Sequence, residues 1–325
     1  MLLDLAAITA GFILLVWGAG RFVEGAAGTA RALGVSPLIV GLTIVGFGTA
    51  APEILVSAMA AFAGNPALGV GNAIGSNITN IALILGLTAI IAPLTVRRVS
   101  LRRELPLLLV IMLASAGLLA DGVLGRIDGI VLLIGLIGFI AWLIRLARRS
   151  QSDPMVTEFT TDMPAAIPLP RALTWLAVGL VVLLISSRML VWGAVNLATA
   201  LGVSDLVIGL TVVALGTSLP ELAASVVAAR RGEHDIAIGN VLGSNIFNLL
   251  AVMGLPGVIR PGPIPGAVLT RDFPIMIFLL LAFFFLAFAA GSRAGGAGRV
   301  SRLSGGLLLA GFAAYQLILY FGILR

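Results

Sequence analysis

The chain has 325 residues, of which 60% are hydrophobic and only 10% are charged. Soluble domains are about 45–50% apolar and about 25% charged, so this composition excludes a soluble fold and predicts an all-α membrane protein. The lack of cysteine and the single histidine exclude disulfide scaffolds, thiolate metal sites and Ser-His-Asp chemistry. The net charge of +6 is the excess of 20 arginines over 14 acidic residues, with no lysine, and in a multi-pass protein such an excess indicates cytoplasmic loops rather than a nucleic-acid partner.

Ten apolar stretches, each of roughly the 20 residues that cross a bilayer, follow one another between charged or Gly/Pro-rich breaks. They are predicted near residues 4–23, 37–62, 69–92, 104–120, 127–147, 172–190, 205–229, 236–259, 273–290 and 304–323. The first stretch has no charged segment before it and no small-residue cleavage site after it. We therefore expect a retained helix there rather than a signal peptide, and ten transmembrane helices in all.

The arginines predict the orientation of these helices. With the N-terminus outside, the loops after spans 1, 3, 5, 7 and 9 hold 15 of the 20 arginines, and the other side holds five. Because cytoplasmic loops carry the excess of arginine, both termini are predicted to be periplasmic, in a protein of the inner membrane. Residues 149–170 form the only polar linker and are predicted to be a cytoplasmic connection.

The two halves on either side of this linker, residues 1–148 and 171–325, are copies of one another. The segment GVSPLIVGLTIVGFGTAAPE (34–53) matches GVSDLVIGLTVVALGTSLPE (202–221), and 27 of the 60 positions from 34 to 93 are identical to those 168 residues later. About five spans separate equivalent positions, and an odd number reverses the direction in which the chain enters the membrane. We expect two inverted five-helix repeats, the arrangement that secondary transporters use for alternating access.

Each copy carries Gly-Thr-x-x-Pro-Glu within an apolar span, at 48–53 and at 216–221. Proline breaks the helix and frees a backbone carbonyl, which is tolerated at membrane depth only inside protein or beside a water-filled cavity. The next residue is Glu53 or Glu221, and an ionised side chain at the bilayer centre costs roughly 2.5–3.5 kcal/mol on insertion scales. No arginine lies within the predicted cores of these spans. The two glutamates are therefore interpreted as ligands for cations rather than as ion-pair partners.

The second motif, Gly-Asn-x-x-Gly-Ser-Asn-Ile-x-Asn, opens the following span at 71–80 and at 239–248. Its serine and its last asparagine are four residues apart and share one helical face, which favours cation binding. The other asparagines, at 72, 77, 240 and 245, are interpreted as hydrogen bonds between helices. Donors that are all oxygen suit hard cations such as Ca²⁺ and Na⁺ rather than zinc or copper.

These paired motifs resemble the alpha-repeats of the calcium/cation antiporter superfamily, most closely its bacterial sodium/calcium exchanger-like branch. The resemblance covers essentially the whole chain, with the motif regions at 41–93 and 209–261. It implies that the second, third, seventh and eighth spans form a central site for transported Ca²⁺ and Na⁺, without a covalent cofactor. The side chains it implies are Thr49, Glu53, Ser76, Asn80, Thr217, Ser218, Glu221, Ser244 and Asn248. Backbone oxygens of the site would fall around Gly46, Thr49, Ala214 and Thr217.

The sequence departs from the family pattern at two positions. Ala50 stands where the second copy keeps Ser218, which removes one hydroxyl ligand. Relatives often carry an aspartate at the position of Asn248. The site then has two formal negative charges, which balance one Ca²⁺ or two Na⁺, so the usual stoichiometry of the family does not transfer and a potassium requirement is not expected.

The function that we expect is an antiporter in which inward movement of Na⁺ drives Ca²⁺ outward. A proton-coupled Ca²⁺/cation exchanger of the same fold is the nearest alternative. A passive channel or cation-binding sensor ranks lower, because each half offers one compact polar cluster and no continuous polar path. An intramembrane enzyme ranks third, because no acid, base or nucleophile arrangement is visible. The protein is expected to lie in the lipid bilayer, and its sequence identifies no protein partner.

Overall fold

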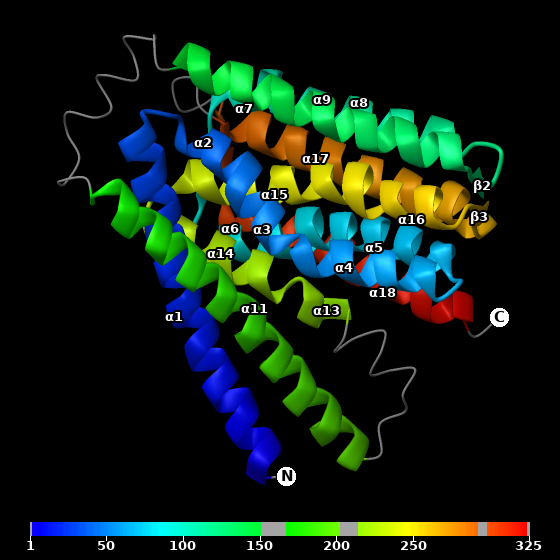
Figure 1. Ribbon diagram of the computed structural model, residues 1–325, viewed down its shortest axis with the longest axis horizontal. Coiled ribbons are helices and arrows are strands. Elements are labelled where there is room, and N and C mark those ends of the chain that lie inside the picture. Colours follow the sequence, from blue (N-terminus) through cyan, green and yellow to red (C-terminus); the bar gives the residue numbers. More distant parts are fainter. Residues whose placement is uncertain (1, 151–166, 202–213, 292–297, 324–325) are drawn as a thin grey trace.

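The computed structural model describes residues 2–150, 167–201, 214–291 and 298–323, and helices make up most of this length (Figure 1). Two helices of 32 residues each, α1 (Leu2–Leu33) and α11 (Leu169–Ala200), pack along each other at one side of the molecule. Gly25 faces Leu176 near one end of the pair, and Gly193 faces Asp4 near the other. The two helices are therefore antiparallel, and their glycines allow the backbones to approach closely.

The centre of the molecule contains two segmented helices. The first is α5 (Pro66–Ile78), η2 (Thr79–Ile84) and α6 (Leu85–Ile91), and the second is α15 (His234–Phe247), η4 (Asn248–Val252) and α16 (Gly254–Ile259). In both, a short π-helical stretch interrupts the α-helix at the last residues of the second motif, and such stretches are frequent at functional sites. The most apolar part of 234–259 is completely buried, so this segment forms the core of the protein.

The first motif lies on two further broken helices. One consists of α2 (Pro37–Val40), η1 (Gly41–Val45), α3 (Gly46–Thr49) and α4 (Ala51–Phe62), with a bend of 44° before α4. The other consists, within the described residues, of α13 (Ala214–Thr217) and α14 (Leu219–Arg230). Both lie beside the central helices, which brings the two motifs of each half together.

The outer helices present apolar side chains outward. They are α8 (Glu104–Leu118), α9 (Arg126–Ser150), α17 (Phe273–Gly291) and α18 (Arg302–Ile323). Ile127 of α9 is 76% exposed and Phe278 of α17 is 67% exposed, while most of the central helix α15 is buried. A buried polar centre inside an apolar surface is stable only in lipid, so the chain is a multi-pass membrane protein.

Short connectors complete the described structure. These are α7 (Arg98–Arg102), η5 (Val268–Asp272) and the strands β1 (Leu94–Val96), β2 (Val123–Leu124), β3 (Gly262–Pro263) and β4 (Gly298–Val300). The strands pair antiparallel as β1 with β4, where Leu94 faces Val300, and as β2 with β3. These ribbons were not expected of an all-α chain, and each joins a loop of the first half to a loop of the second.

The described residues contain fewer helices of membrane-spanning length than the ten predicted. Seven helices of the described residues are long and apolar enough to cross a membrane, or eight if the bent pair Pro37–Thr49 and Ala51–Phe62 is one span. The predicted span at 104–120 is α8, whose 15 residues are short for a bilayer, and the span at 205–229 falls partly outside the described residues. The all-helical membrane architecture is confirmed, and the ten-helix count stays a prediction.

Equivalent helices of the two halves run in opposite directions. In Figure 1, the chain runs from α2 to α4 in one sense and from α13 to α14 in the opposite sense, and α5–α6 runs against α15–α16. The linker predicted at 149–170 lies mostly outside the described residues.

Candidate cation site

Both Gly-Thr-x-x-Pro-Glu motifs break their helices one residue after the threonine. The breaks fall at Ala50 (φ −76°, ψ −1°) and at Ser218 (φ −90°, ψ 6°), which separate α3 from α4 and α13 from α14. Proline two residues later cannot donate to the carbonyl of Gly48 or Gly216, which explains why each helix restarts there. The predicted helix breaks are therefore confirmed. Each new helix begins with its glutamate in the first turn, where the helix dipole favours a negative charge.

Glycines bring the backbones of η1 and α3 into direct contact with that of α15. A Cβ atom on Gly243 would lie 2.6 Å from the carbonyl oxygen of Leu42, and one on Gly46 would lie 3.0 Å from the backbone nitrogen of Ser244. Because no side chain separates the two helices, Ser244 Oγ donates a hydrogen bond to the backbone oxygen of Gly46 at 3.3 Å. Gly46 and Ser244, predicted from opposite halves as members of one site, are therefore in contact.

Thr49 extends this contact between the halves. Its hydroxyl donates to Asn240 Oδ1 at 3.0 Å and lies 3.3 Å from Ser244 Oγ. Asn240 in turn donates to Ser225 Oγ at 2.9 Å and to the backbone oxygen of Glu221 at 3.2 Å. A continuous chain of hydrogen bonds thus leads from the first motif of one half to the glutamate of the other.

The asparagines of the second motif hold the two glutamate segments in the same way. Asn72 donates to the backbone oxygen of Glu53 at 3.2 Å, as Asn240 does to that of Glu221. Asn77 donates to the backbone oxygen of its own repeat equivalent, Asn245, at 3.2 Å. The interpretation of these asparagines as links between helices is confirmed for Asn72, Asn77 and Asn240. It is wrong for the side chain of Asn245, whose Nδ2 and Oδ1 are both buried without a hydrogen-bond partner among the described residues.

The carboxylates themselves are buried and only partly satisfied. Glu53 is 1% exposed and Glu221 is 2% exposed. Within the described residues, Oε2 of each glutamate and Oδ1 of Asn80 and Asn248 are buried without a hydrogen-bond partner. A buried acceptor without a partner costs about 1–3 kcal/mol, and more if it is charged. Carboxylate and amide oxygens of this kind can replace the hydration shell of Na⁺ or Ca²⁺.

The remaining predicted residues lie at the edges of this arrangement. Asn248 donates to Asn77 Oδ1 at 3.0 Å. Ser76 and Ser218 are buried, but no hydrogen bond ties either to the network in the described part of the chain. Thr217 ends α13 and is partly exposed, and Ala214 begins α13, where the structure describes its helical backbone.

Three serines outside the predicted set also belong to the site region. Ser57 donates to the backbone oxygen of Val252 at 2.5 Å, and Ser225 accepts from Asn240. Both follow their glutamate by four residues, so they share its helical face, and this spacing was the available signal. Ser187 of α11 donates to the backbone oxygen of Gly216 at 2.8 Å, the carbonyl that Pro220 leaves without its helical partner. The equivalent of Ser187 in α1 is Ala19, which has no hydroxyl.

The negative charge of the site comes from two carboxylates. The described residues contain no group of three or more acidic, histidine or cysteine side chains that could hold a metal ion. Buried carboxyl groups such as Glu53 and Glu221 must be either protonated or compensated by a positive charge, and no arginine forms an ion pair with either in the described part of the chain.

A multi-pass helical protein with paired intramembrane carboxylates, oxygen-only neighbours and broken helices is typical of the secondary cation transporters. The chain belongs to the sodium/calcium exchanger protein family, whose sequence pattern matches residues 3–145 and 171–321. It is therefore a transporter and not an enzyme, of a family that moves Ca²⁺ and Na⁺ without a covalent cofactor.

Relatives match over nearly the full length. CaxA of Alkalimonas amylolytica is 44% identical over 98% of this chain and 99% of its own length. Inner membrane protein YrbG of Escherichia coli (strain K12) is 40% identical over 98% of each chain. A solved structure of the sodium-calcium exchanger NCX_Mj aligns with a TM-score of 0.82 and 33% identity, covering 100% of this chain and 99% of that one.

Proposed function

We propose that the protein exchanges Na⁺ for Ca²⁺ at one central all-oxygen site, with inward Na⁺ movement driving Ca²⁺ outward. The observation that carries this proposal is the pair of buried glutamates at repeat-equivalent positions, each with a carboxylate oxygen that accepts no hydrogen bond within the described residues. The remaining ligands are Thr49, Thr217, Ser218, Ser76, Ser244, Asn80 and Asn248, with backbone oxygens near Gly46 and Ala214. Membership in the sodium/calcium exchanger family supports the choice of ions.

Charge balance explains why the two ions compete. One Ca²⁺ neutralises two carboxylates, and so do two Na⁺. An uncompensated pair of buried charges is costly, so the protein favours states in which Glu53 and Glu221 are neutralised by either ion. Since both ions need the same oxygens, Ca²⁺ and Na⁺ cannot be bound fully together, which couples release of one to binding of the other.

Alternating access follows if the halves are inverted repeats. The opposite directions of α4 and α14 support this proposal, as does the contact of Asn77 with its own equivalent Asn245, which is expected near a pseudo-twofold axis (Figure 1). We assign the movement to α1 and α11. They pack on each other through glycines and lie against the motif helices, so they can slide against the core as a pair.

Flux measurements in proteoliposomes test this function against its alternatives. A Na⁺ gradient should drive uptake of ⁴⁵Ca²⁺ in the absence of a pH gradient, and Ca²⁺ on the opposite side should accelerate exchange. Uptake driven by a pH gradient without Na⁺ would instead support the proton-coupled exchanger. Flux without acceleration by the opposing ion would identify a channel, because a channel does not couple the two directions.

A further inference from the structure

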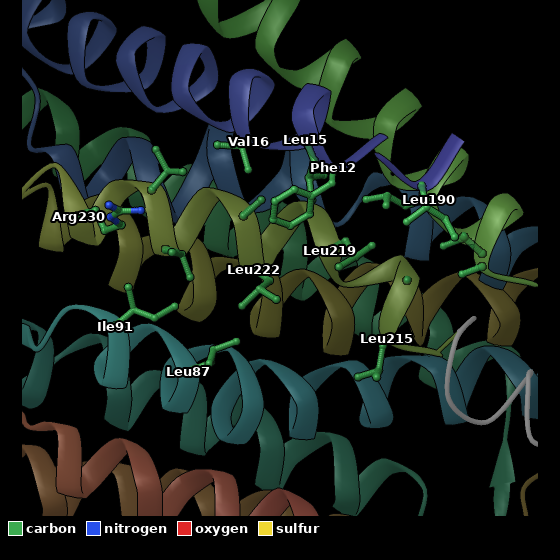
Figure 2. Close-up of a pocket in the computed structure, with 17 residues that line it drawn as sticks. Phe12, Leu15, Val16, Leu87, Ile91, Leu190, Leu215, Leu219, Leu222 and Arg230 are labelled. Atoms are coloured by element: carbon green, nitrogen blue, oxygen red, sulfur yellow. The ribbon is translucent and has the colours of Figure 1, made fainter. Parts of the chain in front are cut away.

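A long apolar groove lies outside the cation site, between the α1/α11 pair and the helices α6 and α14 (Figure 2). Its volume is about 450 Å³, and Arg230 is the only charged residue among the 17 that line it. Phe12 is 61% exposed and Leu215 is 39% exposed, so the groove opens toward the outside of the helix bundle. In a membrane, that outside is lipid.

The groove has one polar end. Figure 2 shows Arg230 and Ile91 at one end and Leu190 and Leu215 at the other. The helix from Leu219 to Arg230 rises roughly 17 Å at 1.5 Å per residue. One leaflet of the hydrocarbon core is roughly 15 Å thick, half of about 30 Å, so the groove has the length of one acyl chain.

The arginine at the polar end is available to an anion. Arg230 is exposed, and no carboxylate of the described residues lies within ion-pair distance of it. Its neighbour Arg231 instead lies 3.9 Å from Glu24. Arg302 does not line the groove, and its Nε donates to the backbone oxygen of Ile90 at 3.0 Å. Guanidinium groups bind phosphate with charge-assisted hydrogen bonds.

We propose that this groove binds an anionic phospholipid, with one acyl chain along α14 and the phosphate on Arg230. The apolar lining selects a hydrocarbon chain, and the guanidinium group of Arg230 at one end selects a negatively charged headgroup over a neutral one. The bound lipid would fill a space lined by α1, α11, α6, α13 and α14, beside the direct contact of α1 with α14. The binding does not depend on which ions are exchanged.

Native mass spectrometry of the purified full-length protein tests the proposal, with phosphatidylglycerol and phosphatidylcholine of identical acyl chains as probes. Wild-type protein should retain phosphatidylglycerol more strongly than phosphatidylcholine. Arg230→Gln should weaken the binding of phosphatidylglycerol about fivefold, which corresponds to the binding free energy that one arginine contributes near an anionic membrane surface. It should leave the binding of phosphatidylcholine unchanged. Arg148→Gln, an exposed arginine at the end of α9 away from the groove, is the matched control and should change neither.

A second variant tests the acyl chain separately from the headgroup. Ala223→Leu adds side-chain volume inside the groove and should reduce retention of both lipids while Arg230 stays in place. Equal retention of the two lipids by the wild type would overturn the proposal. So would an Arg230→Gln variant that behaves like Arg148→Gln, or unchanged retention of both lipids by Ala223→Leu.

Discussion

Thr49 connects the two halves through a single hydroxyl. That hydroxyl donates to Asn240 Oδ1, and the hydroxyl oxygen lies 3.3 Å from Ser244 Oγ, while all three residues are buried. Thr49 is also one of the proposed cation ligands, so loss of its oxygen affects both the network and the ion.

Thr49→Val keeps the shape of the side chain and removes its hydroxyl. It should leave Asn240 Oδ1 without its donor, and a buried acceptor without a partner costs about 1–3 kcal/mol of free energy. If the ion-bound state bears this cost, the Ca²⁺ concentration for half-maximal flux should rise roughly 5- to 150-fold. Thr43→Val is the control, because the Thr43 hydroxyl bonds to backbone oxygens of its own helix, Ile39 at 2.6 Å and Val40 at 3.5 Å. Equal Ca²⁺ dependence of the two variants would argue against a role for Thr49 in the site.

Ser187 introduces an asymmetry between the repeats. Its hydroxyl bonds the backbone oxygen of Gly216 from α11, and Ala19 cannot do the same from α1. If α11 slides, this bond must break. Ser187→Ala should therefore change the exchange rate more than the apparent Ca²⁺ affinity, by a few-fold for a bond of about 0.5–1.5 kcal/mol. A change confined to Ca²⁺ affinity in flux assays would contradict this assignment.

At the scale of elements, the approach of η1 to α15 depends on glycine. A Cβ atom on Gly243 would lie 2.6 Å from the backbone oxygen of Leu42 and 2.9 Å from its Cα, which cannot move as a side chain can. Gly243→Ala should push the two helices apart, weaken the Ser244–Gly46 bond and lower the melting temperature of the purified protein.

Gly138→Ala is the matched control for this substitution. Gly138 lies within α9, and within the described residues nothing approaches its Cβ position to 4 Å. Alanine is a better helix former than glycine by up to about 1 kcal/mol, so this variant should melt at the same or a higher temperature. Thermal stability measured by fluorescence should separate the two variants, and equal melting temperatures would show that the η1–α15 contact is not tight.

The sequence predicts the broken helices and the assembly of the motifs because both depend on local chemistry and on the repeat. Pro52 and Pro220 break the helix wherever they stand, and identical motifs 168 residues apart imply similar surroundings. The bonds of Ser187 and Ser57 could not be predicted, because each reaches a backbone oxygen of a distant helix whose position depends on packing. The short α8 and the two β-ribbons depend on tertiary contacts in the same way.

At the scale of the whole molecule, the orientation in the membrane is still a prediction from the arginines. The chain has no cysteine, so single introduced cysteines report their own location without background. Asp121→Cys, in the turn between α8 and α9, should react with a membrane-impermeant maleimide added to intact spheroplasts. Arg148→Cys, near the far end of α9, should react only after the membrane is opened. The reverse pattern would place both termini in the cytoplasm.

The central claim is that Glu53 and Glu221, one from each half, hold the same transported ions. Na⁺-gradient-driven ⁴⁵Ca²⁺ uptake into proteoliposomes, compared between the wild type, Glu53→Gln and Glu221→Gln, tests it most directly. Glutamine preserves the size of the side chain and removes the charge, so each single substitution should reduce uptake at least 100-fold. Glu24 pairs with Arg21 away from the site, so the control Glu24→Gln should leave uptake unchanged. Uptake that persists near the wild-type rate in either single variant would contradict a shared central site.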